Sequence, residues 1–129
     1  MILVDTDVLI AHLRGVEAAR GWLRSARESS GARLAASVVT TTEILGGMRS
    51  GERSEVARLL ATLQLHPVTE VVARRAGELM RRYRRSHAGI GLGDYLVAAT
   101  AQISGLDLAT LNVRHFPMFD GLRPPFTLE

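Results

Sequence analysis

The chain has 129 residues, of which 47% are hydrophobic and 22% are charged. This length and hydrophobic content are typical of one folded core, so we expect residues 1–129 to form a single domain. The absence of cysteine excludes disulfides, thiolate metal sites and cysteine nucleophiles. All 16 basic residues are arginine, and the net charge of +3 is compatible with a phosphate-bearing partner.

Polar residues interrupt the apolar start of the chain. Asp5, Asp7 and His12 break it well before the ~20 apolar residues that a membrane helix needs. No basic segment of the kind that opens a secretory signal precedes it. We therefore expect no membrane association and a cytoplasmic location.

Short apolar runs alternate with helical periodicities along the chain, which predicts an α/β fold with a mostly parallel sheet. The first run has no polar alternation and predicts a central strand that is covered on both faces. Strands are expected at 2–4, 34–39, 64–68 and 106–111, the third of them at a sheet edge because it contains Pro67. Helices are expected near 8–13, 18–26, 43–48, 56–63, 70–85 and 94–104.

Acidic and amide side chains follow the predicted strands at the points where these strands end. Asp5 and Asp7 come directly after the first strand, Glu43 opens the helix after the second, and Asn112 follows the last. The carboxyl ends of parallel strands share one sheet edge, and Asp94, at the start of its helix, would face it if the topology permits. Carboxylates gathered there would repel one another without a cation, and oxygen ligands without cysteine favour Mg²⁺ or Mn²⁺ over zinc.

Each acidic residue also has a purely structural interpretation. Thr40 to Glu43 fits a capping box, in which Glu43 would only accept a hydrogen bond from the backbone N–H of Thr40. Asp94 would be an ordinary first-turn acid, and Asp5 or Asp7 would cap the helix that follows. Taken together, this interpretation needs several coincidences at one sheet edge, so the metal site is favoured.

Four segments of the chain resemble one family. Residues 2–10, 37–47, 93–101 and 105–116 resemble PIN-domain ribonucleases, and within that domain VapC-type toxins of toxin–antitoxin pairs. The resemblance implies a three-layer PIN-like fold, in which helices flank a twisted, mostly parallel sheet of about four to five strands. It also implies a Mg²⁺- or Mn²⁺-dependent endoribonuclease that cuts structured RNA such as tRNA or rRNA. A cognate antitoxin would inhibit this enzyme, which would form a homodimer.

The same resemblance assigns roles by position. Asp5, Glu43 and Asp94 would be the catalytic, metal-binding acids, and Asp7 falls where the family varies. Many PIN domains have a fourth acid where this chain has Asn112. An amide brings no charge, so Asn112 and Asp7 are candidates for further ligands, and His115 and Asp7 are possible substitutes for the missing acid. Both one-metal and two-metal arrangements stay open.

Arginines crowd the predicted helix 70–85 on the side away from its apolar stripe. Guanidinium groups bind phosphate through paired hydrogen bonds, so Arg82 and Arg85 near the end of this helix are candidate RNA contacts. His115 is a third candidate. The alternative for the arginines is a solvated face, and the alternative for His115 is a structural or surface role.

Two other functions stay open at this stage. A haloacid-dehalogenase-like phosphatase also has an Asp-x-Asp motif after an apolar strand. That chemistry normally adds a Thr or Ser soon after and a distant lysine, whereas this chain has Val8 and Leu9 there and no lysine. The second is a catalytically weak PIN-like module that binds RNA or protein, for which Asn112 is the motivation.

Overall fold

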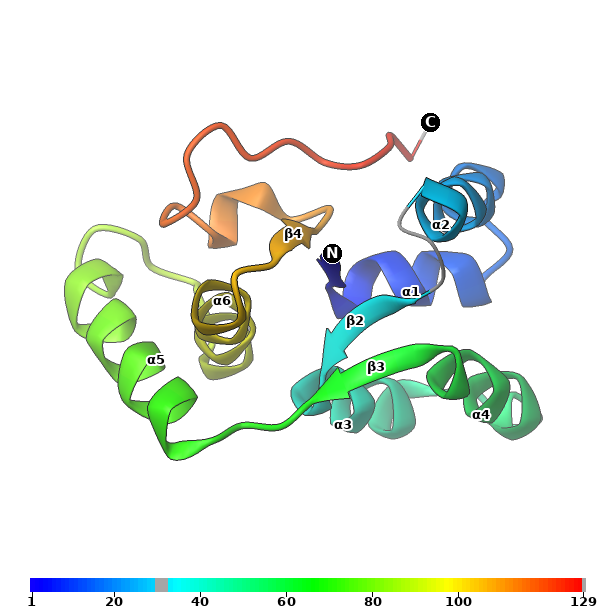
Figure 1. Cartoon of the computed structure of the whole chain (residues 1–129), viewed down its shortest axis with the longest axis horizontal. Coiled ribbons are helices and arrows are strands. Elements are labelled where there is room, and N and C mark those ends of the chain that lie inside the picture. The colour runs from blue at the N-terminus through cyan, green and yellow to red at the C-terminus, as the bar shows by residue number, and fades with distance from the viewer. Residues whose placement is uncertain (30–32, 129) are drawn as a thin grey trace.

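The computed structural model of the chain describes residues 1–29 and 33–128. Within these ranges, four strands form one sheet in the order β3-β2-β1-β4, and all three pairings are parallel (Figure 1). The strands are β1 (Ile2–Val4), β2 (Leu34–Ser37), β3 (Leu63–His66) and β4 (Asp107–Ala109). The predicted α/β fold is confirmed, with β1 inside the sheet and β3 at an edge.

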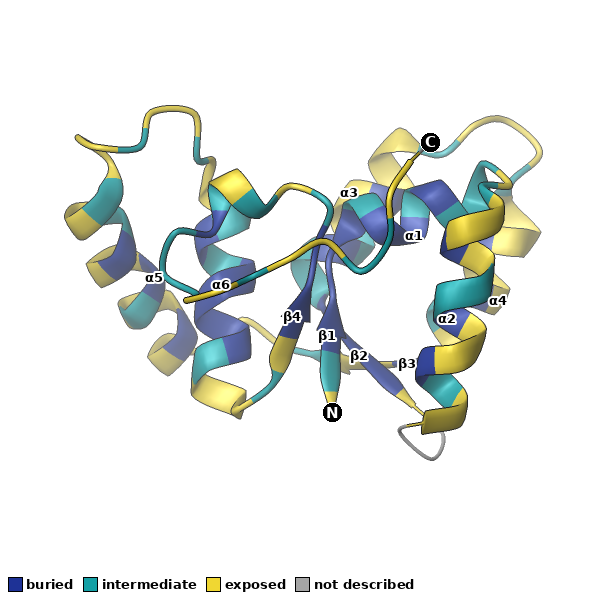
Figure 2. Cartoon of the chain, turned by 90° about the horizontal axis from the view of Figure 1, so that it is seen from above, coloured by how far each residue is buried: buried dark blue, intermediate teal, exposed yellow. Residues whose placement is uncertain are grey.

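Helices pack against both faces of the sheet, giving three layers. On one face lie α1 (Thr6–Leu13), α2 (Glu17–Ser29), α3 (Val38–Gly47) and α4 (Arg53–Ala61). On the other face lie α5 (Glu70–Tyr83) and α6 (Leu92–Ser104), as Figure 2 shows. A short 3-10 helix, Val113–His115, follows β4. In the described part of the chain, no helix is both long enough and apolar enough to span a membrane.

Alternate residues of the strands belong to two separate hydrophobic cores. Leu3 of β1 packs with α5 and α6, whereas Val4 packs with the helices on the opposite face. Both side chains are fully buried. A strand that is covered on both faces has no solvent side, which explains why the first apolar run shows no polar alternation.

Three predicted strands end earlier in the structure than the sequence suggested, and the third of the four strands stops at His66 rather than at Val68. The second strand stops at Ser37, whose hydroxyl accepts a hydrogen bond from the backbone N–H of Val39 at 3.0 Å and so caps α3. Val38 and Val39, expected in the strand, therefore begin the helix. The last strand stops at Ala109 rather than Leu111, and α5 ends at Tyr83 rather than near Arg85.

Candidate active site

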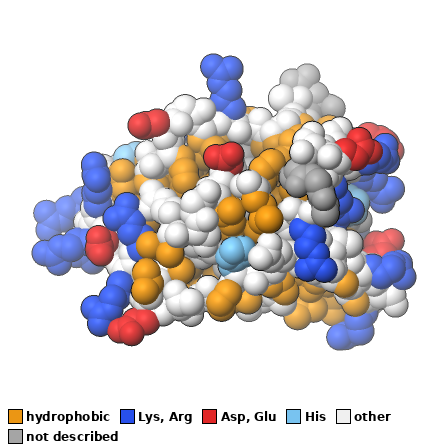
Figure 3. Space-filling model, viewed as in Figure 1, with side chains coloured by type: hydrophobic (Ala, Val, Ile, Leu, Met, Phe, Trp, Pro, Cys, Tyr) orange, Lys and Arg blue, Asp and Glu red, His pale blue; other side chains and the backbone are white. Residues whose placement is uncertain are grey.

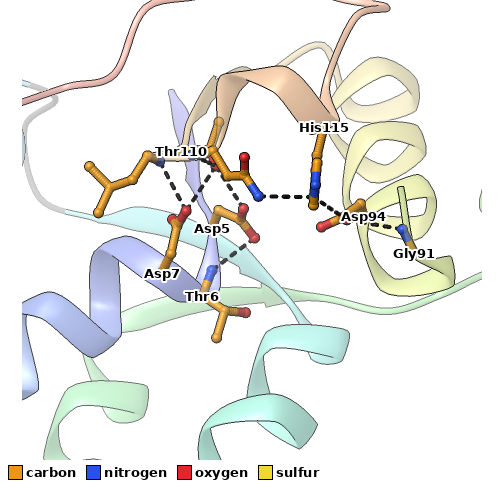
Figure 4. Close-up of polar contacts among 9 residues, drawn as sticks. Asp5, Thr6, Asp7, Gly91, Asp94, Thr110 and His115 are labelled. Atoms are coloured by element: carbon orange, nitrogen blue, oxygen red, sulfur yellow. Dashed lines mark hydrogen bonds and ion pairs between the residues drawn. The ribbon is translucent and has the colours of Figure 1, made fainter. Parts of the chain in front are cut away.

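Asp5 lies where β1 ends and α1 begins. Its backbone N–H donates to the carbonyl oxygen of Ala109, so the chain stays beside β4 for one residue past β1. Asp5 Oδ1 accepts from the backbone N–H of Thr6 at 2.9 Å, and Oδ2 accepts from the hydroxyl of Thr110 at 2.8 Å (Figure 4). The capping interpretation is therefore correct for one oxygen. The other oxygen is held at the carboxyl edge of the sheet.

Asp7 lies in the first turn of α1, beside the segment that follows β4. Its Oδ2 accepts from the backbone N–H of Leu111 at 3.1 Å and from the hydroxyl of Thr110 at 3.3 Å. Its Oδ1 is buried and has no hydrogen-bond partner. A buried acceptor without a partner costs free energy, so Asp7 Oδ1 is suited to bind a ligand.

Electrostatics link the acids at this edge of the sheet. Burial, followed by the charge of Asp7, raises the pKa of the Asp5 carboxyl to about 7, and Asp94 contributes in the same direction. Hydrogen bonds from Thr110 and Thr6 oppose this rise. Burial also raises the pKa of Asp7. Asp5 is thus within electrostatic reach of both Asp7 and Asp94, and a cation there would favour the charged form of Asp5.

The sequence suggested that Glu43 opens its helix, but in the structure Glu43 lies in the middle of α3. The helix begins at Val38 with Ser37 as its cap, so Thr40 lies inside the helix and the alternative capping-box interpretation of Glu43 is wrong. Glu43 Oε1 accepts a hydrogen bond from the hydroxyl of Thr6 at 2.6 Å instead. This contact orients the carboxylate toward the start of α1, where Asp5 and Asp7 also lie.

The first turn of α6 brings Asp94 to the same side of the molecule. A Cβ atom at Gly93 would lie 3.4 Å from Glu43 Oε2, so the missing side chain leaves room for this carboxylate. Asp94 is the third residue of α6 rather than its first. Its Oδ2 accepts from the backbone N–H of Gly91 at 3.2 Å, so its expected role as a first-turn acid is confirmed.

The segment after β4 adds two polar side chains on the Asp94 side. His115 Nδ1 lies 3.0 Å from Asp94 Oδ2 and 2.9 Å from Asn112 Nδ2 (Figure 4). The Asn112 side chain is therefore turned toward His115, and its backbone N–H donates to the hydroxyl of Thr110 at 3.1 Å. His115 was expected as an RNA contact, as a substitute for the missing fourth acid, or as a structural or surface residue. Its contact with Asp94 was not foreseen.

The chemistry of these residues fits a hard divalent cation, although their arrangement is only partly assembled. The acids supply oxygen ligands alone, and Asp7 Oδ1 has no partner. Among the described residues, however, no three His, Asp or Glu side chains are arranged to hold one ion. Glu43 and Asp94 each make the contacts described above through one carboxylate oxygen, Oε1 of Glu43 and Oδ2 of Asp94.

Arg82 and Arg85 lie apart from the acids, on the exposed last turn of α5 and just after it. The Arg82 guanidinium stacks 5.4 Å from the centre of the Tyr83 ring. Within the described residues neither arginine has an acidic partner, whereas Arg74 and Arg75 of the same helix pair with Glu70 and Glu78. Figure 3 shows arginine side chains projecting from this end of the molecule.

A hollow of about 600 Å³ lies between α2 and α4, at the end of α1, and none of the candidate acids lines it. Its walls carry Arg20, Arg24 and Arg27 from α2 and Arg58 from α4. This hollow was not among the sites predicted from the sequence. The spacing of the three arginines on α2 was the available signal, since residues three and four apart share one helix face.

Comparison with known proteins identifies the family. The model of the PIN domain family matches residues 2–121. The chain belongs to the PIN domain family. It is 67% identical over 128 residues to Ribonuclease VapC10 of Mycobacterium tuberculosis, covering 99% of this chain and 95% of that protein. It is 44% identical over 126 residues to Ribonuclease VapC19 of the same organism, covering 98% and 100%.

A solved structure supports the same assignment. A toxin–antitoxin complex from Klebsiella pneumoniae contains a chain that is 27% identical, with a TM-score of 0.78 and 98% of both chains covered. The fold also matches a VapBC2 chain from Rickettsia felis, at 20% identity and the same TM-score, covering 95% of this chain and 96% of that one. The predicted resemblance to VapC-type PIN domains is thus confirmed.

Proposed function

We propose that this PIN-domain chain is an endoribonuclease toxin of the VapC type that hydrolyses phosphodiester bonds in structured RNA, with tRNA or rRNA as substrate. Catalysis depends on Mg²⁺ or Mn²⁺, and a cognate antitoxin inhibits it. The observation that carries the proposal is the pair of carboxylates Asp5 and Asp7, which both contact the hydroxyl of Thr110 at the carboxyl edge of the sheet, with Asp7 Oδ1 buried and without a hydrogen-bond partner. The ribonuclease relatives at 67% and 44% identity support the same activity.

The acidic residues have different roles in this proposal. Asp5, Glu43 and Asp94 would hold the ion, which when bound lowers the pKa of water and neutralises charge on the phosphate. Asp7 Oδ1 is buried and has no hydrogen-bond partner, and it would orient the attacking water or serve as a further ligand. Asn112 contacts His115 through its Nδ2, so its Oδ1 would be the atom that serves as a further ligand.

Arginines would supply the contacts to RNA that the acids cannot make. Arg82 and Arg85 have no acidic partner among the described residues and are free to bind phosphate. His115 holds Asp94 and is half-exposed, so its ring is accessible to an RNA strand at the same time. We assign these three side chains to RNA binding.

The remaining parts of the proposal concern partners and location. A chain of similar fold is part of a toxin–antitoxin complex, which supports a cognate antitoxin here. A homodimer and a cytoplasmic location, where tRNA and rRNA occur, belong to the same proposal.

Cleavage of RNA by the chain without antitoxin tests this function. We expect purified tRNA or rRNA fragments to be cut in Mg²⁺ or Mn²⁺, to stay intact in EDTA, and to be protected when the antitoxin is added. Cleavage that continues undiminished in EDTA would contradict the metal dependence.

RNA cleavage, measured together with phosphatase activity and RNA binding, separates the two alternative functions. Hydrolysis of p-nitrophenyl phosphate without RNA cleavage would support the phosphatase. RNA binding without cleavage in either metal would support the weak binding module that Asn112 suggests.

A further inference from the structure

The hollow between α2 and α4 is a second concave part of the surface, separate from the acids. It lies at the last turn of α1, beside His12, whereas Asp5 and Asp7 lie at the start of the same helix. Figure 3 shows several arginine side chains on the right of the molecule, where Figure 1 places α2 and α4. The arginines that line the hollow are Arg20, Arg24, Arg27 and Arg58.

The protein itself leaves the charge of these four arginines unpaired. In the part of the chain that the structure describes, none of them forms an ion pair. Arg27 donates through Nη2 to the hydroxyl of Thr62 at 2.8 Å, and its buried Nε has no partner. Arg20 Nε lies 3.5 Å from the carbonyl oxygen of His12. Because a guanidinium group has five N–H donors, most of the donors around the hollow are unused.

The charge and the size of the hollow indicate what kind of ligand fits it. Glu28 and Glu55 also line it, so four positive charges face two negative ones, and the excess is two. A phosphate monoester carries about −1.5 to −2 charges at pH 7, and guanidinium groups bind its oxygens through paired hydrogen bonds. The volume of about 600 Å³ exceeds the size of a phosphate group and is typical of small-molecule sites.

The walls also have apolar parts, formed by Leu13, Leu23 and Leu59. We propose that the hollow is a second binding site of this chain, which binds the terminal phosphate of a nucleotide through the arginines and the nucleoside against the leucines. The ligand is a phosphate monoester, from a free nucleoside monophosphate or from the end of an RNA strand. This site requires neither a metal ion nor cleavage of RNA, so it is independent of the acids.

Binding of 5′-AMP to the whole chain in EDTA, measured by isothermal titration calorimetry, tests the inference. We expect 5′-AMP to bind at least about tenfold more tightly than adenosine, because charge-assisted hydrogen bonds to phosphate are the strong ones. Arg24→Gln combined with Arg58→Gln should weaken 5′-AMP binding by about tenfold or more. Both side chains are exposed, so their replacement should leave the fold intact. The control, Arg74→Gln with Arg75→Gln, removes the same charge from α5 and should bind close to wild type.

A second variant gives a change in the opposite direction, which a damaged fold would not produce. Glu55→Gln removes a negative charge from the wall of the hollow and should tighten 5′-AMP binding by about two- to fivefold. Glu78→Gln, an exposed acid on α5, should have no effect.

Competition identifies the source of the phosphate. Displacement of 5′-AMP by a short RNA with a 5′-phosphate, but not by the same RNA without it, would assign the site to an RNA end. Displacement by neither RNA would assign it to free nucleotides. The inference would be overturned if neither 5′-AMP nor the phosphorylated RNA binds, or if the Arg24 and Arg58 double variant binds 5′-AMP like wild type. Tighter binding of a hexaglutamate peptide than of 5′-AMP would also overturn it, in favour of an acidic protein partner.

Discussion

The hydroxyl of Thr6 donates a hydrogen bond to Glu43 Oε1 at 2.6 Å and so joins the first residue of α1 to the middle of α3. Thr6 directly follows Asp5 in the sequence, so one turn of the backbone presents Asp5 and also orients Glu43. The position of the Glu43 carboxylate is therefore set by the start of α1, although the residue belongs to another helix.

Replacing Glu43 by glutamine tests whether its charge is used in catalysis. Glu43→Gln keeps an oxygen that can accept from Thr6 but removes the negative charge that would bind the cation. RNA cleavage in Mn²⁺ should fall by about a hundredfold or more, which corresponds to about 3 kcal/mol of activation free energy.

Glu78→Gln is the control for this variant. Glu78 is an exposed acid on α5 that pairs with Arg75, and such surface pairs contribute little. Cleavage rates should stay at the wild-type level in this variant. Equal activity of both variants would show that Glu43 is only a partner for the hydroxyl of Thr6.

Asp5 should make the metal-free protein less stable as the pH rises. Its pKa is about 7 in the folded chain against 3.8 ordinarily, so the folded state binds the proton more tightly between these values. The stabilisation from the protonated form is complete below pH 3.8 and is lost as the pH rises through about 7. Each unit of pKa difference corresponds to about 1.4 kcal/mol.

Denaturant unfolding in EDTA at pH 5, 6, 7 and 8 measures this effect as a difference between wild type and Asp5→Asn. The stability of wild type relative to the variant should fall by a few kcal/mol across the series. His12, whose pKa is lowered by burial and then by Arg20, acts in the opposite direction. Its contribution is common to both proteins and cancels in the difference, and a difference that is independent of pH would refute the expected shift.

Arg82 and Arg85 should contribute to the salt dependence of RNA binding. We assume that each arginine neutralises one phosphate of single-stranded RNA. Replacing both by glutamine should then reduce the slope of the logarithm of the RNA-binding constant against the logarithm of the salt concentration by about 1.4. Fluorescence anisotropy of labelled RNA in EDTA measures the slope without cleavage.

The matched control is the pair of arginines on the same helix that already bind acids, replaced as Arg74→Gln and Arg75→Gln. These changes alter the net charge equally and should have a smaller effect on the slope. Identical slopes for both double variants would mean that Arg82 and Arg85 are only solvated.

The sequence predicted the edge of the sheet at which the acids meet, because the carboxyl ends of parallel strands lie together whatever their order. It did not predict where α3 begins. Three consecutive threonines starting at Thr40 all suit a helix cap, but the observed cap is Ser37. Ser37 is the last residue of β2 and pairs with His66 of β3. That end point depends on contacts between strands, which a local pattern does not contain.

The contact of Thr110 with Asp5 could not be predicted for a similar reason. Its hydroxyl reaches Asp5 because β1 and β4 pair with Val4 opposite Ala109, which places the next residue of each strand side by side. This register is a property of the folded sheet. The contact of His115 with Asp94 likewise depends on how the 3-10 helix after β4 packs against α6, and no spacing in the sequence indicates it.

The most direct test of the account compares RNA cleavage by Asp94→Asn and Asp107→Asn in Mn²⁺, with wild type and an EDTA sample alongside. Asp107 is an exposed aspartate at the start of β4, at the edge of the sheet opposite the acids. Its replacement by asparagine is the same chemical change away from the site and serves as the control. The account predicts that Asp94→Asn abolishes cleavage while Asp107→Asn cuts at the wild-type rate. Cleavage by Asp94→Asn at the wild-type rate would contradict the proposed metal site.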